Sequence, residues 1–462
     1  MMDIGTAKKA PFWWDAVDAK VTRPALGGDT EVDVAIIGAG FTGLWTAYYL
    51  LEHNPSLRVA VLEKHHVGFG ASGRNGGWCH AEYPLGVGTL AKEHGTAEAI
   101  RFMRALYDSV DQVGKVTELE GIDCHYAKGG VLTLARSEVQ MSRVAAEIEE
   151  ARHLGIGEAD LKQLSAGEAR EMLNATGILG GTWHPHGAAI QPALLVHGLA
   201  AACERRGAVI YEDSGVEHVS SNRVETRHGA VTATMVVRAT EGFTSDLPGL
   251  KRTMVPLYSL MVATEPLSEA MWNELGLHTR PTFGDFRNLI IYGQRTADGR
   301  FAFGGRGAPY YFGSSTDPKN DIHDGVHAEL VRVLHELFPQ LADITITHRW
   351  GGALGAPRDW RPSVSVDRRA GLAWGGGYVG DGVNTAHLAG QTLADLVLER
   401  QTDLVTLPWI QHEWKSWEPE PLRFVGINAG LWMAKAADRS EERRGKPSQW
   451  AAIGNWMRGK TR

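Results

Sequence analysis

The sequence predicts an α/β protein (α+β overall), in which a Rossmann-like dinucleotide-binding domain carries an inserted antiparallel-sheet domain. Three observations predict this fold. A βαβ unit with a glycine-rich turn lies at 31–64, a second strand–turn–helix lies at 371–398, and a strand-rich segment at 250–350 separates them. The chain has 462 residues, which exceeds the size of one hydrophobic core, so at least two domains are expected.

Composition excludes several classes of protein. The net charge of −7 gives no reason to expect nucleic-acid binding. The sequence contains no apolar run of 18 residues, and its first nine residues lack the apolar core of a secretory signal, so we expect no transmembrane segment. The three cysteines, Cys79, Cys124 and Cys203, show no metal-binding spacing. They fit a reducing compartment, so we expect a cytoplasmic protein without a metal site.

The βαβ unit carries the clearest motif in the chain. Val32–Ile37 is a short apolar run typical of a buried parallel strand. An apolar, helix-compatible stretch, Leu44–Leu51, follows the turn. The turn itself has the spacing G-x-G-x-x-G, with Phe41 and Thr42 between its last two glycines: Gly38, Gly40 and Gly43. This order of elements is typical of dinucleotide binding.

Each residue of this motif has a physical role. Gly38 allows the tight turn, Gly40 lets the backbone approach a pyrophosphate, and Gly43 lets the helix pack close to the strand. The helix N-terminus offers N–H groups and a positive dipole end to the phosphates. A second strand, Val59–Leu62, ends at Glu63, whose carboxylate can accept hydrogen bonds from ribose hydroxyls. The alternative is a glycine-rich turn in an unrelated α/β fold.

A second glycine-rich segment follows directly, G-F-G-A-S-G-R-N-G-G at 68–77. Glycine at half of its positions lets backbone approach a flat or charged ligand. Arginine adds a fixed cation, and serine and asparagine add directional hydrogen bonds. A solvated loop is the alternative, but its place after Glu63 favours a ligand. The expected contacts are Gly70, Ala71, Ser72, Arg74, Asn75, Gly76 and Gly77.

The motifs G-A-G-F-T-G, L-E-K and G-A-S-G-R-N-G-G together resemble the FAD-dependent amine and amino-acid oxidoreductases of the D-amino-acid oxidase/glycine oxidase family, closest to its γ-glutamylputrescine oxidase-like branch. The resemblance covers 30–400 and implies FAD, with Glu63 and Lys64 beside its ribose. Some relatives attach the flavin through a histidine in this loop or a late cysteine. Arg74 stands near the histidine position and no cysteine follows Cys203, so non-covalent FAD is implied.

The resemblance also assigns two later segments to the cofactor. Val216 matches the residue that holds the adenine through its backbone. In V-V-R-A-T-E-G-F, Glu241 replaces a usual glycine. The segment 371–382 leads into a helix whose N-terminus points at the flavin N1–C2=O edge in the family, which adds Gly380, Gly382 and Val383. The alternative, a second Rossmann turn for NAD(P), does not fit the spacing.

The domain organisation follows from these assignments. An N-terminal arm containing Phe12, Trp13 and Trp14 is expected to be pinned to the body by its rings. The C-terminal extension is basic with an apolar side. It is either an interfacial or partner-binding helix pair or a tail packed on the acidic body. The expected division is 1–29 arm; 30–85, 181–249 and 351–400 discontinuous FAD-binding domain; 86–180 and 250–350 substrate (roof) domain; 401–462 extension.

Four residues are candidates for contact with the substrate. Arg306 ends the strand F-A-F-G-G-R, where relatives place an active-site residue, and could clamp a carboxylate or phosphonate; a structural ion pair is the alternative. Tyr258 begins a roof strand, and an ordinary sheet position is its alternative. Trp350 is expected as an apolar wall beside the flavin. His80 is a candidate for proton transfer, or a bystander.

The resemblance implies the reaction. Hydride passes from the carbon alpha to nitrogen of a primary or secondary amine or amino acid to flavin N5, and the imine is then hydrolysed. The electrons go to oxygen, giving hydrogen peroxide, or to another acceptor. Sarcosine oxidases use a roof-strand lysine for oxygen, and Ala302 stands in that place. The alternatives are a non-catalytic flavoprotein subunit and a hydroxy-acid dehydrogenase on the same fold.

Overall fold

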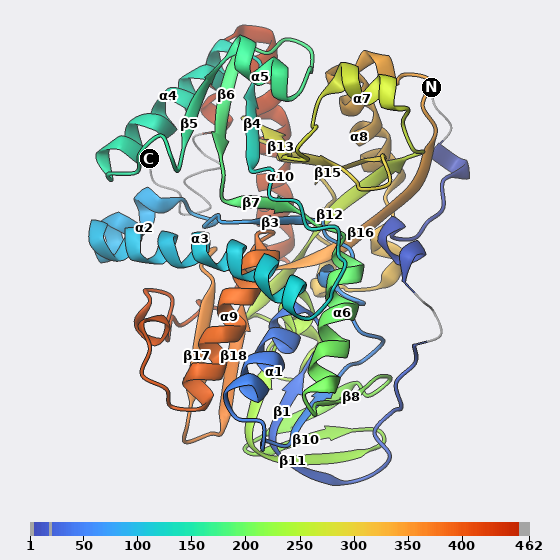
Figure 1. Ribbon diagram of the computed structural model, residues 1–462, viewed down its shortest axis with the longest axis vertical. Coiled ribbons are helices and arrows are strands. Elements are labelled where there is room, and N and C mark those ends of the chain that lie inside the picture. The colour runs from blue at the N-terminus through green and yellow to red at the C-terminus, as the bar shows by residue number, and fades with distance from the viewer. Residues whose placement is uncertain (1–3, 18–20, 452–462) are drawn as a thin grey trace.

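The structure is a computed structural model that describes residues 4–17 and 21–451. Figure 1 shows two sheet-based domains one above the other, with α3 at the level between them. The lower, nucleotide-binding domain contains the glycine-rich turns at 38–43 and 376–382. The upper, roof domain contains most of the antiparallel strands. Among the described helices, none combines the length and the apolar character needed to cross a membrane.

The sheet of the nucleotide-binding domain has the strand order β17-β18-β11-β1-β2-β8. All neighbours along this path are parallel except β17 and β18. This is the arrangement expected from the βαβ unit, since parallel strands need crossover helices. The bounds are β1 Thr30–Ile37, β2 Val59–Leu62, β8 Val209–Tyr211, β11 Gly229–Arg238, β17 Ser363–Asp367 and β18 Leu372–Gly376.

The two faces of this sheet are buried differently. Val34 and Ile36 of β1 belong to a large apolar core shared with α1 (Phe41–His53), α6 (Pro192–Arg205) and α9 (Gly382–Val397). Ala35 and Ile37 belong to a smaller core on the other face, because successive strand residues point to opposite sides. The hairpin of β9 (Val216–Ser220) and β10 (Arg223–Thr226), which pairs with β11, contributes to this smaller core.

The roof sheet has the strand order β16-β12-β15-β14-β13-β4-β6-β5. It is antiparallel except where β13 runs parallel to β4. Its outer core packs against α8 (Asp324–Leu337) and α7 (Glu269–Leu275), while α4 (Glu138–His153) and α5 (Ala166–Met172) lie over its other end. The bounds are β4 Val131–Ala135, β5 Lys162–Ser165, β6 Gly180–His184, β12 Met254–Thr264, β13 Thr282–Asp285, β14 Ile291–Arg295, β15 Phe301–Arg306 and β16 Ile346–Pro357.

The first part of segment 86–180 packs mainly on the nucleotide-binding domain and also contacts α4. This segment begins with two helices, α2 (Val87–His94) and α3 (Thr96–Leu119), separated at Gly95, whose φ of +90° favours glycine. Apolar residues of α3 join the core around α1 and α9. Asn384 of α9 donates a hydrogen bond to the Leu106 carbonyl (2.9 Å). An amphipathic helical pattern does not specify which domain the helix packs on. The expected boundary at 86 therefore needs correction to a point after α3, which packs on the nucleotide-binding domain.

The C-terminal helix α10 (Leu422–Arg444) packs on the roof through acidic side chains. Asp438 accepts hydrogen bonds from the backbone N–H groups of Asn288 (2.7 Å) and Leu289 (2.9 Å), and Glu441 pairs with Arg143 (2.8 Å). The basic residues at its end are exposed instead of pairing with an acidic surface. Residues 452–462, including the predicted apolar positions Ile453 and Trp456, lie outside the described part of the chain.

Candidate cofactor and substrate site

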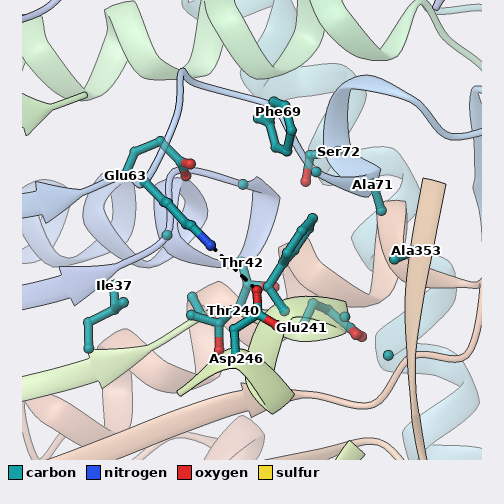
Figure 2. A pocket seen from close by; sticks show the side chains of 18 of the residues that line it. Ile37, Thr42, Glu63, Phe69, Ala71, Ser72, Thr240, Glu241, Asp246 and Ala353 are labelled. Carbon is teal, nitrogen blue, oxygen red and sulfur yellow. Dashed lines mark ion pairs between the residues drawn. The ribbon is translucent and has the colours of Figure 1, made fainter. Parts of the chain in front are cut away.

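A cavity of about 740 Å³ opens at the carboxyl ends of β1 and β2. Figure 2 shows Ile37 and Glu63 at one end of it and Ala71, Ser72 and Ala353 at the other. Residues far apart in the sequence line it together. Those predicted from sequence are Gly38, Gly40, Phe41, Thr42, Glu63, Lys64, Gly70, Ala71, Ser72, Asn75, Val216, Gly380, Gly382 and Val383.

The first glycine turn has the geometry that its spacing requires. Gly38 has a φ of +105°, and a Cβ there would lie 2.7 Å from the Ala239 carbonyl oxygen. A Cβ on Gly43 would lie 2.0 Å from the Gly38 carbonyl oxygen, so α1 can start this close to the turn only with glycine. The first N–H groups of a helix have no partner within it; here that of Phe41 is bound by Ser72, and the start of the helix lines the cavity.

Glu63 closes the far end of the cavity. Its Oε2 accepts a hydrogen bond from the Ala39 N–H (2.9 Å) and its Oε1 accepts one from the His65 N–H (2.9 Å). Burial raises the pKa of Glu63, and these N–H groups oppose the shift. Each oxygen keeps a second lone pair for a ribose hydroxyl. Beside it, Lys64 forms an ion pair with Asp246 (3.5 Å), drawn as a dashed line in Figure 2.

The second glycine-rich segment is held in shape by its own polar side chains. Ser72 Oγ accepts a hydrogen bond from the Phe41 N–H (2.8 Å), which ties the segment to the start of α1. Asn75 donates to the Ala71 and Ser72 carbonyls (3.1 Å each) and accepts from the Gly77 N–H (2.8 Å). The segment is therefore a fixed wall of the cavity.

Gly76 and Gly77 lie under the roof and do not line the cavity. A Cβ on Gly76 would lie 2.6 Å from the Tyr292 ring, and a Cβ on Gly77 would lie 2.0 Å from Gln294 Nε2. Gln294 is buried and donates hydrogen bonds to the Gly76 (2.7 Å) and Gly77 (3.1 Å) carbonyls. These two glycines therefore let a roof strand rest on the loop, a role that the sequence did not indicate.

Arg74 is directed away from the cavity. Its guanidinium pairs with Asp321 of the roof and lies 4.7 Å from the ring centroids of both Trp14 and Phe69. Its Nη1 also donates to the Gly351 carbonyl (3.3 Å). The cation that was expected to face the cofactor is therefore used to join the loop to the roof. Burial raises the pKa of Asp321, and Arg74 opposes that shift.

The N-terminal arm fastens the same loop. Trp13, only 1% exposed, donates from Nε1 to the Asn75 carbonyl (2.8 Å), and its own carbonyl accepts from Gln191 Nε2 (2.7 Å). Trp350 donates to the Arg74 carbonyl (2.8 Å), and its ring lies edge-on to Trp13. Trp350 therefore belongs to the support behind the loop and does not line the cavity, which corrects its expected role as a wall beside the flavin.

Glu241, where the family has glycine, braces the late turn. Its Oε1 accepts hydrogen bonds from the N–H groups of Gly377 (3.0 Å) and Tyr378 (2.9 Å). Its φ of +40° is unusual for a residue with a side chain, so this contact holds it in a strained backbone. Burial raises the pKa of Glu241 to about 7. Tyr378, also missed from sequence, bonds Thr42 (2.9 Å) across the cavity.

Arg306 lies above this turn, at the end of β15. Its Nη2 donates to the Val379 carbonyl and lies near Gly380, where a Cβ would come within 2.9 Å of it. Burial lowers the pKa of Arg306, and Asp381 opposes the shift. Within the part of the chain that the structure describes, no carboxylate lies within 4.0 Å of this guanidinium, which argues against the structural ion pair considered above.

Tyr258 lies on the wrong face of its strand for a substrate contact. It joins the outer core of the roof with α8 and donates to the Ser315 carbonyl (3.5 Å). Its neighbour Ser259 lies on the inner face and hydrogen-bonds Tyr292 (2.8 Å). The alternative reading, an ordinary sheet residue, is therefore the correct one for Tyr258. Alternation along β12 could have located the inner residue only if the register were known.

His80, at the end of β3 (Trp78–His80), lies behind the same turn. β3 pairs with β7 (Gly187–Ala189), which fixes its backbone. His80 Nε2 lies 3.4 Å from Asp381 and Nδ1 lies 3.4 Å from Glu82. Burial lowers the pKa of His80, but the two carboxylates outweigh burial and raise it overall.

The residues present fit a dinucleotide that carries a ring system under a roof. The cavity holds one helix N-terminus for phosphates, a carboxylate for a ribose, and a second helix N-terminus, that of α9, at the opposite end. The wall between them combines the backbone at Gly70 with the side chains of Ala71, Ser72 and Asn75. The fold and the site thus define a dinucleotide-binding protein of the flavoenzyme type.

Comparison with known proteins specifies the family. The family described as FAD dependent oxidoreductase (DAO) matches residues 33–396. Gamma-glutamylputrescine oxidoreductase of Escherichia coli is 30% identical over 396 residues, covering 84% of this chain and 86% of that protein. The structure of glycine oxidase from Geobacillus kaustophilus superposes with a TM-score of 0.67 at 22% identity, covering 83% of this chain and 99% of that one. The chain belongs to the DAO family of FAD-dependent oxidoreductases.

Proposed function

We propose that this enzyme oxidises a primary or secondary amine or amino acid that bears an anionic group, with FAD held non-covalently. The observation that carries the anionic group is Arg306, a largely buried guanidinium without a carboxylate partner among the described residues. Asp381 and Glu82 offset the burial of this charge only in part, so a bound anion would stabilise it further. The named relatives act on gamma-glutamylputrescine and glycine, which supports the amine.

FAD, when bound, accepts the hydride that leaves the carbon alpha to nitrogen. The chain's own residues hold it and position the substrate. Glu63 and Val216 would hold the nucleoside end. The N-terminus of α1 would face the phosphates, and the N-terminus of α9 would face the end of the cavity away from Glu63. Arg306, fixed by the Val379 carbonyl, would bind the substrate's anionic group, so that its amine carbon lies against the cavity.

The electron acceptor is the second part of the proposal. Ala302 is fully buried on β15 between Ala263 and Gln294, in a cluster with Met261 and Trp350. An apolar site there supplies no cation to stabilise reduced oxygen. We therefore propose either an acceptor other than oxygen or oxygen reduction assisted elsewhere in the site. Peroxide release during turnover in air separates these outcomes.

Two coarser features complete the proposal. All three cysteines are buried and free, which supports a reducing, cytoplasmic location. The exposed basic residues at the end of α10, Arg439, Arg443 and Arg444, support contact with an acidic partner or surface. Locating the tagged protein in fractionated cells tests the location. Comparing the binding of the wild type to an acidic surface with that of a variant lacking these three charges tests the contact.

The test of the substrate class is a change at Arg306. With an anionic amine, R306Q is expected to lower kcat/KM roughly 100-fold, because a buried charge pair contributes about 2–5 kcal/mol. With a neutral amine of similar size, the same variant should change little. R369Q, a change at an exposed arginine of the other domain, is the matched control. An equal loss with both amines would contradict the role of Arg306 in binding an anion.

A further inference from the structure

Three neighbouring side chains lead from the late glycine turn, which lines the cavity, to solvent. Asp381 precedes α9 between Gly380 and Gly382, which both line the cavity. His80 lies next, with Nε2 3.4 Å from Asp381 Oδ1, and Glu82 follows, with Oε2 3.4 Å from His80 Nδ1. The exposed fraction of these side chains is 20% for Asp381, 5% for His80 and 59% for Glu82.

We propose that Asp381, His80 and Glu82 are a proton relay that carries the proton of the substrate ammonium from the roofed site to water. This inference rests on the amine oxidation proposed above. An aliphatic amine is protonated at neutral pH, because its pKa is about 10. It must lose a proton before hydride can leave the adjacent carbon, and a site covered by a roof needs a route for that proton.

The proton balance is simple and involves no electrons. The N–H bond of the ammonium breaks, its electron pair stays on nitrogen, and the proton passes to the Asp381 carboxylate. Imidazole then accepts a proton at Nε2 and releases the proton of Nδ1 to Glu82, which is exposed and exchanges with water. A ring flip returns His80 to its first tautomer. Histidine suits this task since both of its nitrogens can carry the proton.

The surroundings of His80 favour transfer along this path. Arg306 of β15 faces Asp381 and Glu82, whose negative charges oppose the lowering of the Arg306 pKa by burial. His184, at the end of β6, also faces His80, and burial lowers the pKa of His184 to about 3, so it stays neutral. Glu147 of α4 faces Glu82 and is itself exposed. Among these groups, Asp381 and Glu82 are the two carboxylates within 3.4 Å of the ring of His80.

The backbone around the relay supports a fixed geometry. His80 ends a strand paired with Gly187, directly after the glycine-rich loop. Asp381 is held by the turn at Gly380, which Glu241 braces through Gly377 and Tyr378. The turn therefore holds the Asp381 end of the relay beside the cavity, while Glu82 lies beyond the strand, where the chain reaches solvent.

The experiment follows anaerobic flavin reduction by stopped flow across pH in the FAD-loaded enzyme. H80Q, which keeps a similar size but cannot relay a proton, is expected to slow reduction about 100-fold or more near pH 7. The loss should shrink at higher pH, where the amine arrives neutral, and added imidazole should restore part of the rate in H80A. E82Q and D381N should shift the pH profile in the same direction. H278Q, at an exposed histidine, is the control.

A second readout does not depend on turnover. In the wild type, the pKa of His80 measured by NMR should lie above that of an exposed histidine, and it should fall in E82Q and D381N. A wild type that amines bleach and an H80Q variant that matches it at every pH would overturn the relay alone. Inactivation of the wild type by EDTA, reversed by a divalent cation, would overturn it in favour of a bound ion. If no amine bleaches the wild type, amine oxidation fails and the relay falls with it.

Discussion

Removing the ring of Trp13 tests how the cofactor loop is held. Trp13 is 1% exposed and packs with Ala193, Met261 and Trp350. Truncating such a buried aromatic costs about 3–5 kcal/mol, and losing its hydrogen bond to the Asn75 carbonyl adds about 1 kcal/mol. Because the arm does not line the cavity itself and contacts it through loop residues such as Asn75, this loss should reach FAD only through the loop.

The expected result for W13A is FAD binding weakened about 10- to 100-fold. That range corresponds to roughly 1.4–2.8 kcal/mol, so it requires only part of the lost packing energy to be transmitted to the loop. W13F keeps most of the packing and loses the N–H donor, so it should cost about 1 kcal/mol. The matched control is W432A on α10, where the side chain is 59% exposed and truncation should change stability by less than about 0.5 kcal/mol.

The assay is titration of the FAD-free protein with FAD, followed by flavin fluorescence, beside urea unfolding of the same proteins. If W13A binds FAD as tightly as W432A does, the loop does not depend on the arm. If W13A unfolds earlier but binds FAD normally, the arm contributes to stability and has no part in shaping the loop. Either result would refute the role assigned here to the arm.

Two further predictions concern the glycine turn and Glu241. G43A should abolish FAD binding, because its Cβ would lie 2.0 Å from the Gly38 carbonyl oxygen. G426A, at a helix position with open space, should bind FAD normally. Equal FAD affinities of the two variants in titrations would contradict this. Burial raises the pKa of Glu241 from 4.5 to about 7, so the native state binds a proton in that window that the unfolded state does not. Stability of the FAD-free protein should therefore fall as pH rises from 4.5 to 7, and E241Q should remove this slope in urea unfolding; an unchanged slope would assign it to other groups.

The fold could be predicted from sequence where local patterns are sufficient. The turn at Gly38, the strand that ends at Glu63 and the helix after Gly382 are local features, because glycine spacing and apolar runs specify backbone shape within a few residues. Their meeting around one cavity was predicted from the family resemblance.

The direction of individual side chains could not be predicted in the same way. Arg74 turns to Asp321, 247 residues later in the chain, and Tyr258 faces the outer core because the register of β12 places Ser259 inside. Both outcomes depend on long-range pairing, which a local motif does not specify. The same holds for α3, whose amphipathic pattern is satisfied by either domain. Gln294 carried no signal at all, since its role exists only against Gly76 and Gly77.

The most direct test of the central claim is anaerobic mixing of the purified, FAD-loaded enzyme with amines in a panel of anionic and neutral compounds. We expect at least one amine or amino acid to bleach the flavin absorbance near 450 nm. We also expect hydroxy acids matched in shape to leave the flavin oxidised. Bleaching by hydroxy acids alone, or by no compound in the panel while FAD remains bound, would contradict the assignment as an amine oxidoreductase.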